Sequence, residues 1–188
     1  MKKRILACLL ALVMIIGVLP VMALAEDVAI TPDYSWYTDG ATEFTNATPA
    51  QLLGFENIVN GTDGKAPDTF PGKKIILASD IDLAAIENWT PIGKLDASVS
   101  FMGEFDGNGK TISNLTIAPT SSGNSKLRLG LFASPEGVSI HDLTLKNTII
   151  TQMNVKADAR VGALDGNMWY AGYVGNVIKF AHKTLNHL

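Results

Sequence analysis

The sequence is poor in cysteine. The one cysteine among 188 residues is Cys8, which lies in an apolar run at the N-terminus. Once that run is removed, a disulfide, a thiolate metal site and a cysteine nucleophile are all excluded. The chain also has no His-Glu-x-x-His sequence, no Gly-x-Ser-x-Gly elbow and no P-loop. The usual motifs of metallopeptidases, α/β-hydrolases and nucleotide-binding enzymes are therefore missing.

Basic residues are also few. Lys and Arg number 15 against 18 Asp and Glu, and Lys2, Lys3 and Arg4 stand at the very start. Without these three, 12 basic residues oppose 18 acidic ones, a formal net charge of −6. Nucleic acids and anionic membranes bind proteins through a basic footprint, which this composition does not provide. We therefore expect no nucleic-acid partner, and no membrane association after the N-terminal run is cleaved.

The N-terminus has the pattern of a secretory signal peptide. Residues 1–4 are positively charged, residues 5–21 carry no charge, and the small-x-small sequence Ala23-Leu24-Ala25 precedes Glu26. This order predicts a signal peptide over residues 1–25, with cleavage after Ala25. A membrane anchor is the alternative, because the apolar run approaches the ~20 residues of a membrane span; Pro20 and the Ala-x-Ala site favour cleavage. The expected location is secreted or on a bacterial cell surface.

One helix is predicted, within a lead-in segment over residues 26–72. Thr48 is a candidate N-cap, Pro49 suits the first helical position, and Gln51 completes a capping box. Apolar side chains at helical spacing follow, and Asn60-Gly61 supplies the stop. The helix should span about residues 49–60.

Residues 73–178 contain a repeat with a period near thirty residues. Its first half has a glycine between apolar positions, and its second half has an Asn or Asp followed by Leu or Val. The second halves start 28 and 34 residues apart, and the glycines stand 27 and 32 apart. Such periods suit stacked coils. The glycines are Gly103, Gly130 and Gly162, and the second halves contain Asn114-Leu115, Asp142-Leu143 and Asn176-Val177.

The second half has a physical interpretation as a corner between strands. Asn tolerates the left-handed backbone conformation that a tight corner needs. We therefore predict that Asn114, Asp142 and Asn176 stack as a ladder, and that Leu115, Leu143 and Val177 are buried in one common column. The alternative is that the three polar residues are ordinary turn residues of a β-sandwich.

The residues of these segments resemble a known family. Three stretches resemble the coils of secreted bacterial proteins with GLUG-type repeats. They are Trp89-Thr90-Pro91-Ile92-Gly93, residues 101–115 with Phe105-Asp106-Gly107-Asn108-Gly109-Lys110-Thr111-Ile112-Ser113-Asn114-Leu115, and Gly130-Leu131-Phe132. The resemblance covers roughly residues 48–177. It implies a right-handed parallel β-helix of the kind found in adhesin-like surface proteins and beside IgA-cleaving metallopeptidase domains. The family implies an architecture more than an activity.

The resulting fold expectation is all-β: a right-handed parallel β-helix (β-solenoid) of few coils over residues 73–178, preceded by the single helix. Residues 179–188 show no repeat and form a poor cap, so we expect a reading frame truncated or shifted near Val177. The expected function is a non-catalytic extracellular or cell-surface binding or structural module, part of a larger adhesin-like protein. Its partner would be a host or matrix glycan or protein. The alternative is a polysaccharide lyase or glycoside hydrolase on the same scaffold.

Candidate chemical groups all have a plainer interpretation. Asp106-Gly107-Asn108-Gly109 resembles the start of a calcium loop, but the twelfth position is Ile117, which cannot ligate; a tight turn is the better interpretation. Asp80 and Asp82 share one side of a strand, where an outward-facing pair is more common than a calcium or lyase site. His141 should point to solvent at a corner. We therefore predict no catalytic residue, no cofactor and no metal ligand.

The aromatic residues leave two interpretations open. They either stack on sugars or cover the open end of the coils. The residues concerned are Trp36, Tyr37, Trp89, Trp169, Tyr170 and Tyr173.

Overall fold

The computed structural model describes residues 29–94, 98–118, 128–133, 135–153, 160–164 and 173–187. The predicted signal peptide, with its cleavage site after Ala25, lies outside the described residues. Within the described ranges, no helix is both long enough and apolar enough to cross a membrane.

The helix α2 spans Pro49–Asn60, the range that the capping signals indicate. The side chain of Thr48 accepts a hydrogen bond from the Gln51 amide at 3.2 Å, and the Gln51 side chain accepts one from the Ala47 amide at 2.8 Å. The helix ends because Gly61 adopts the left-handed conformation, with φ of 64°, and its amide bonds back to the last turn.

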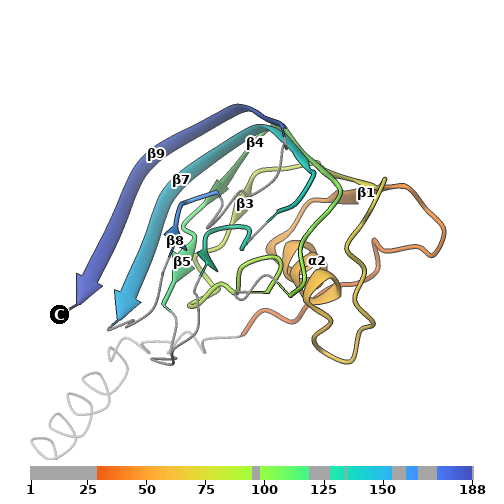
Figure 1. Cartoon of the computed structure of the whole chain (residues 1–188), viewed down its shortest axis with the longest axis horizontal. Coiled ribbons are helices and arrows are strands. Elements are labelled where there is room, and N and C mark those ends of the chain that lie inside the picture. The colour runs from red at the N-terminus through yellow and green to blue at the C-terminus, as the bar shows by residue number, and fades with distance from the viewer. Residues whose placement is uncertain are drawn as a thin grey trace, which may run out of the picture.

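Parallel strands form the main sheet (Figure 1). Its seven strands have the path β1-β2-β4-β7-β5, with β3 beside β4 and β9 beside β7. A separate two-stranded sheet pairs β6 with β8. Their bounds are β1 Glu43–Asn46, β2 Lys74–Leu77, β3 Ile81–Asp82, β4 Glu104–Ser113, β5 Thr116–Ile117, β6 Arg128–Leu129, β7 Ser139–Met153, β8 Arg160–Val161 and β9 Tyr173–His187.

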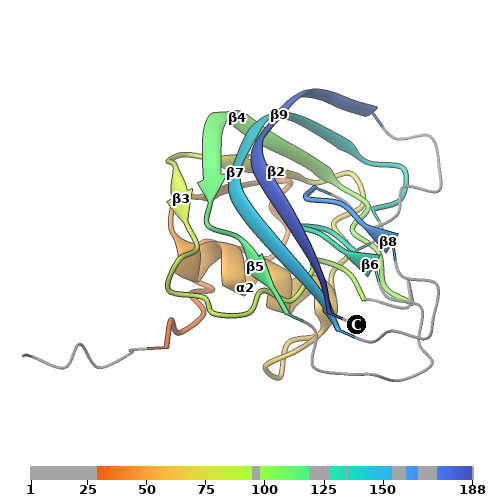
Figure 2. The ribbon, with the colours of Figure 1, turned by 90° about the vertical axis from the view of Figure 1, so that its left-hand side faces the viewer.

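The predicted right-handed parallel β-helix is wrong, because the main sheet is open. The strands β4, β7 and β9 follow one another and bend together (Figures 1 and 2), but β6 and β8 form a sheet of their own and do not close the main sheet into a ring. Among the described residues between β3 and β4 (83–94 and 98–103), one isolated bridge is formed, from Ile92 to Phe132. Pro91 contributes to this break, since it has no amide hydrogen for a ladder. A repeat period indicates which strands are neighbours, but it does not determine whether the sheet closes around the core.

The repeat predicts neighbouring strands correctly only in part. Leu143 pairs with Val177 in the register of β7 and β9. In the register of β4 and β7, however, Leu143 pairs with Lys110. Leu115 instead accepts a hydrogen bond from the Ile149 amide at 2.8 Å. The predicted common column of Leu115, Leu143 and Val177 is therefore wrong, although Leu115 and Leu143 are both buried.

The predicted column fails because the fold has two kinds of corner, and both are built from the same residue types. Asn108 and Asp142 have positive φ values of 49° and 52° at one corner, and Asn114 and Asn147 have values of 59° and 53° at the other. The register of β4 against β7 shifts between Asp106 and Lys110, where the first corner lies. When the repeats are aligned so that Asn114 matches Asp142, a residue from one kind of corner is therefore equated with a residue from the other kind.

The glycines of the repeat divide in the same way. Gly130 and Gly162 follow the paired residues Leu129 and Val161, and the Gly162 amide donates to the Leu129 carbonyl at 2.9 Å. Gly103 lies outside this pair of strands. It precedes β4 where a Cβ would lie 2.7 Å from the carbonyl oxygens of both Phe70 and Lys73. Gly103 is thus required for close backbone approach, a different role from that of Gly130 and Gly162.

The core lies between the concave side of the sheet and α2, which Figure 2 shows crossing beside it. Phe55 from the helix stacks on Phe105 from β4, with ring centroids 6.1 Å apart. Trp89 is 1% exposed and donates its indole hydrogen to the Leu131 carbonyl at 3.2 Å. The sheet's inner face is covered in this way, so the sheet side chains that could contact a ligand are those on its outer face.

The last strand, β9, pairs with β7 along its length and reaches His187. The predicted boundary at residue 178 therefore does not coincide with the end of a strand. Lys179, which breaks the apolar pattern of the repeat, pairs with Leu145.

Candidate functional site

A charged cluster lies on the outer face of β2, β4 and β7. Side chains alternate between the two faces of a strand, and Ile75, Phe105 and Ile140 are fully buried on the inner face. Their neighbours in sequence therefore point outward. The outward residues Lys74, Glu104, Asp106 and His141 make up what we call the face cluster.

The strand register brings the face cluster together. Lys74 pairs with Glu104 across β2 and β4, and Asp106 pairs with His141 across β4 and β7. The Lys74 Nζ lies 2.9 Å from Glu104 Oε1 and 2.8 Å from Asp106 Oδ2. The His141 Nε2 lies 3.1 Å from the same Glu104 oxygen. One ammonium and one imidazole thus share two carboxylates from a single strand.

Electrostatics keep the lysine and both carboxylates charged. Hydrogen bonds to Asp106 and Glu104 raise the pKa of Lys74 well above its usual range. The hydrogen bond from Lys74 lowers the pKa of Glu104. Burial raises the pKa of Asp106, but hydrogen bonds from Lys74 and the Asn108 amide outweigh it, so the net pKa is lowered. At neutral pH the cluster therefore contains a fixed cation between two fixed anions.

His141 is held at its other nitrogen by a further carboxylate. Its Nδ1 lies 2.9 Å from Asp142 Oδ2 and 3.7 Å from Asp106 Oδ1. Burial lowers the pKa of His141, but hydrogen bonds to Asp142 and Glu104 more than offset that effect, so the pKa is raised. His141 therefore lies on the outer face, as predicted, but these partners leave its imidazole partly buried.

These charge states limit what chemistry the face cluster can perform. A general acid at neutral pH needs a raised carboxyl pKa, and a lysine base needs a lowered one. Glu104 and Asp106 have lowered values, and Lys74 has a raised value. These three residues are therefore suited to holding a charged or polar ligand more than to transferring protons.

A second outward feature is the corner ladder, formed by Asp82, Asn114 and Asn147. Asn147 donates from its side-chain nitrogen to the Asn114 side-chain oxygen at 3.2 Å. Asn114 donates in turn to Asp82 Oδ1 at 2.7 Å. A ladder through Asn114 is thus present, but its members are Asp82 and Asn147 in place of the predicted Asp142 and Asn176. Hydrogen bonding from Asn114 and the Ala84 amide lowers the pKa of Asp82.

The other predicted positions have structural roles. Asp80 accepts a hydrogen bond from the Thr111 amide at 2.8 Å, and Asp82 accepts one from the Asn114 side chain, so each carboxylate has a structural role. Asp106 accepts from the Asn108 amide at 2.8 Å, which closes a tight turn inside β4. Asn176 lies in β9 between Gly175 and Val177, the partners of His141 and Leu143.

The aromatic residues of the lead-in segment pack into the core end. Trp36 contacts Phe44, Phe55 and Phe70, with ring centroids 5.6, 6.2 and 6.4 Å away. Tyr37 stacks on Phe44 at 5.3 Å. This packing favours the covering role over sugar stacking for these residues. Trp169 and Tyr170 lie outside the described residues.

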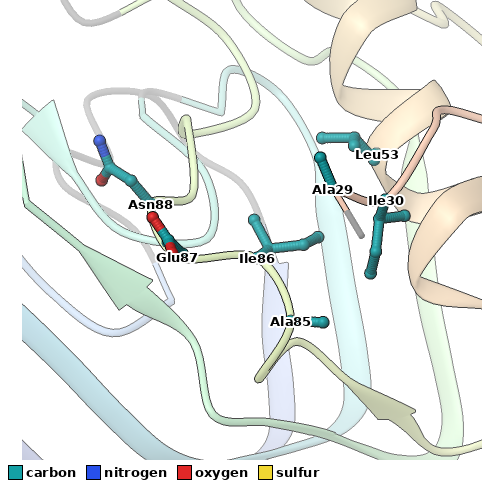
Figure 3. Close-up of a pocket in the computed structure, with 7 residues that line it drawn as sticks. All are labelled: Ala29, Ile30, Leu53, Ala85, Ile86, Glu87 and Asn88. Carbon is teal, nitrogen blue, oxygen red and sulfur yellow. The ribbon is translucent and has the colours of Figure 1, made fainter. Parts of the chain in front are cut away.

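A shallow apolar pocket of about 470 Å³ lies between α2 and the segment after β3 (Figure 3). Ile30, Leu53 and Ile86 form its apolar part, and Glu87 and Asn88 lie together at the other end. Asn88 is already used, because its side-chain oxygen accepts from the Ala118 amide at 2.7 Å. The pocket is a depression lined mainly by loop residues.

Sequence reasoning missed the face cluster. No site was predicted at Lys74, Glu104 or Asp106, and His141 was predicted to point to solvent. The available signal was the alternation in Lys74-Ile75, Glu104-Phe105-Asp106 and Ile140-His141, which places charged residues on one side of three strands. Only the correct strand register could show that the three segments meet.

Comparison of the chain with protein-family models, with curated proteins and with solved structures gives no match. The resemblance to GLUG-type repeats therefore stays a prediction from the quoted residues.

Proposed function

We propose that the protein is a non-catalytic binding module that a bacterium exports to its surface or surroundings. The observation that carries this proposal is the face cluster, which presents paired charges on the outer side of a parallel sheet whose inner side is fully packed. A sheet of this kind holds outward side chains at fixed spacings without needing a ligand to order them. Such preorganisation reduces the entropy cost of binding.

Export is the second support for the proposal. The signal-peptide pattern over residues 1–25 predicts that the chain leaves the cytoplasm. The acidic balance of the remaining chain disfavours polyanions as ligands. A polar ligand such as a neutral host or matrix glycan, or a protein surface, fits both the location and the charge.

The test uses protein that has been exported by a bacterial host and purified without a polyhistidine tag. Binding to a glycan array and to immobilised matrix proteins is compared for the wild type, Glu104→Gln and Asp39→Asn. Asp39 is an exposed acid in the lead-in segment, so its variant makes a matched charge change away from the face cluster. We expect one ligand class to bind saturably, with Glu104→Gln weakening it and Asp39→Asn leaving it unchanged.

Two results would overturn the proposal. One is the absence of saturable binding to any glycan or matrix protein by a folded, exported sample. The other is release of new reducing ends from pectin, mucin or alginate in proportion to protein concentration, which would favour the lyase or hydrolase alternative.

A further inference from the structure

We infer that Glu104, Asp106 and His141 form a zinc site whose cation position is occupied by the Lys74 ammonium. One donor atom from each of the three residues lies within 4.8 Å of the others, and all three residues are partly buried. This inference does not depend on the proposed binding role, because it concerns a metal and not the ligand of the module.

The donors converge because of the strand geometry. Glu104 and Asp106 are two residues apart on β4 and so share one face, and the register places His141 directly opposite Asp106. Neighbouring strands lie about 4.8 Å apart, so side chains in register can reach a common ion. The three donors are therefore held by the backbone ladder, not by a loop.

The Lys74 ammonium is direct evidence that this position attracts a cation. It comes from a different strand, β2, and bonds to both carboxylates, at 2.9 Å and 2.8 Å. Lysine carries its charge on a flexible four-carbon stem, and the Lys74 side chain is 27% exposed. It can therefore leave the carboxylates for solvent when a divalent ion competes for them.

The orientation of His141 matches that of a metal-binding imidazole. Metal-bound histidines usually donate their second ring nitrogen to a carboxylate outside the metal's own ligands. Here Asp142 Oδ2 lies 2.9 Å from His141 Nδ1, and Asp142 is not one of the three donors. Nε2 is thereby directed toward Glu104, which lies 3.1 Å away.

The donor chemistry favours zinc over calcium and magnesium. Zinc is bound by His nitrogen and by Asp or Glu oxygen, and three protein ligands leave a fourth position for water or a ligand. Calcium takes six to eight oxygen ligands and magnesium prefers an octahedron of oxygens, so neither suits a site with an imidazole. The site should therefore bind Zn²⁺ in preference to Ca²⁺ and Mg²⁺.

The experiment measures Zn²⁺ binding by isothermal titration calorimetry at pH 7.5, with the exported, untagged protein. We expect one Zn²⁺ per chain, and at least tenfold tighter binding by Lys74→Met, because that variant removes the competing cation. His141→Ala should abolish the site. Asp142→Asn should weaken it roughly tenfold, the lower end of the usual effect of such supporting carboxylates.

The other two histidines provide the matched control. His182 and His187 lie in β9, so the double variant His182→Ala/His187→Ala removes the alternative imidazoles while keeping the face cluster. This variant should bind Zn²⁺ as the wild type does. Saturating Ca²⁺ or Mg²⁺ should not reduce the Zn²⁺ signal.

Thermal unfolding gives a second measurement that does not require tight binding. Zn²⁺ should raise the Tm of Lys74→Met more than that of the wild type, since a ligand that binds the folded state stabilises it. If His141→Ala does not fold, Glu104→Gln replaces it in both experiments. The inference is overturned if Lys74→Met binds Zn²⁺ no more tightly than the wild type, or if only the double histidine variant loses binding.

Discussion

Asn147 donates a side-chain hydrogen bond to Asn114, 33 residues earlier in the sequence, and both residues have positive φ values. Each asparagine therefore does two things: it adopts a backbone conformation that most residues avoid, and its side chain donates to a residue of the preceding segment, Asn114 or Asp82. The two contributions can be separated by substitution.

Asn114→Ala should destabilise the protein by about 2–3 kcal/mol, because it strains the left-handed backbone and removes both hydrogen bonds of the corner ladder. Asn114→Gly keeps the conformation and loses only the side chain, so it should cost about 1 kcal/mol less than the alanine variant. Urea unfolding of the two variants and the wild type measures the difference. Equal stabilities of Asn114→Gly and the wild type would show that the ladder contributes nothing.

Gly107→Ala should be far more damaging than Gly109→Ala. A Cβ at Gly107 would collide with the Asp142 carbonyl oxygen and lie 2.6 Å from the Leu143 Cα, and both atoms are backbone of the neighbouring strand. At Gly109 nothing lies within 4 Å, and only its φ of +70° opposes a side chain. We expect a loss of more than about 3 kcal/mol for the first variant and about 1 kcal/mol for the second.

The comparison tests the strand register directly. Thermal or urea unfolding of the two single variants is the measurement. If Gly109→Ala were as destabilising as Gly107→Ala, the close approach of β4 and β7 at this corner would be wrong.

Glu56 should make stability fall as the pH rises. This carboxyl is 3% exposed in α2. Burial raises its pKa from 4.5 to about 7, although the hydrogen bond from Asn60 lowers it in part. Between these two values the folded protein keeps a proton that the unfolded chain has released, so stability decreases with rising pH. Well below pH 4.5 the Glu56 carboxyl is protonated in both the folded and the unfolded state, and well above pH 7 the decrease in stability is complete.

Glu56→Gln removes this dependence and can still accept the hydrogen bond from Asn60. Its stability relative to the wild type should increase from pH 4.5 to pH 8 by up to about 3 kcal/mol, at 1.36 kcal/mol for each unit of pKa. Urea unfolding at both pH values measures the gap, with the exposed Glu87→Gln as control. A gap that is the same at both pH values would contradict the prediction.

Export can be tested with the full chain expressed in a bacterium. Cleavage after Ala25 should leave Glu26 as the new N-terminus, which N-terminal sequencing of the exported protein reads directly. Replacing both Ala23 and Ala25 by Leu should block cleavage, because the processing site requires small residues there. An exported protein that retains Met1 would instead support the membrane-anchor alternative.

The sequence alone was sufficient for features that depend on a few adjacent residues. The helix at Pro49–Asn60 was predicted from Thr48, Pro49, Gln51 and Gly61, since capping is a local competition for backbone hydrogen bonds. The positive φ of Asn114 and Asp142 was likewise implied by residue type.

The pairing of those corners was decided only in the tertiary structure. Asn114 and Asp142 look equivalent in sequence, yet the first bonds to Asp82 and Asn147 while the second supports His141. The open sheet and the face cluster were also decided by long-range strand pairing. Lys74, Glu104 and His141 are far apart in the chain, and they meet because long-range register, which no local pattern encodes, places their strands side by side.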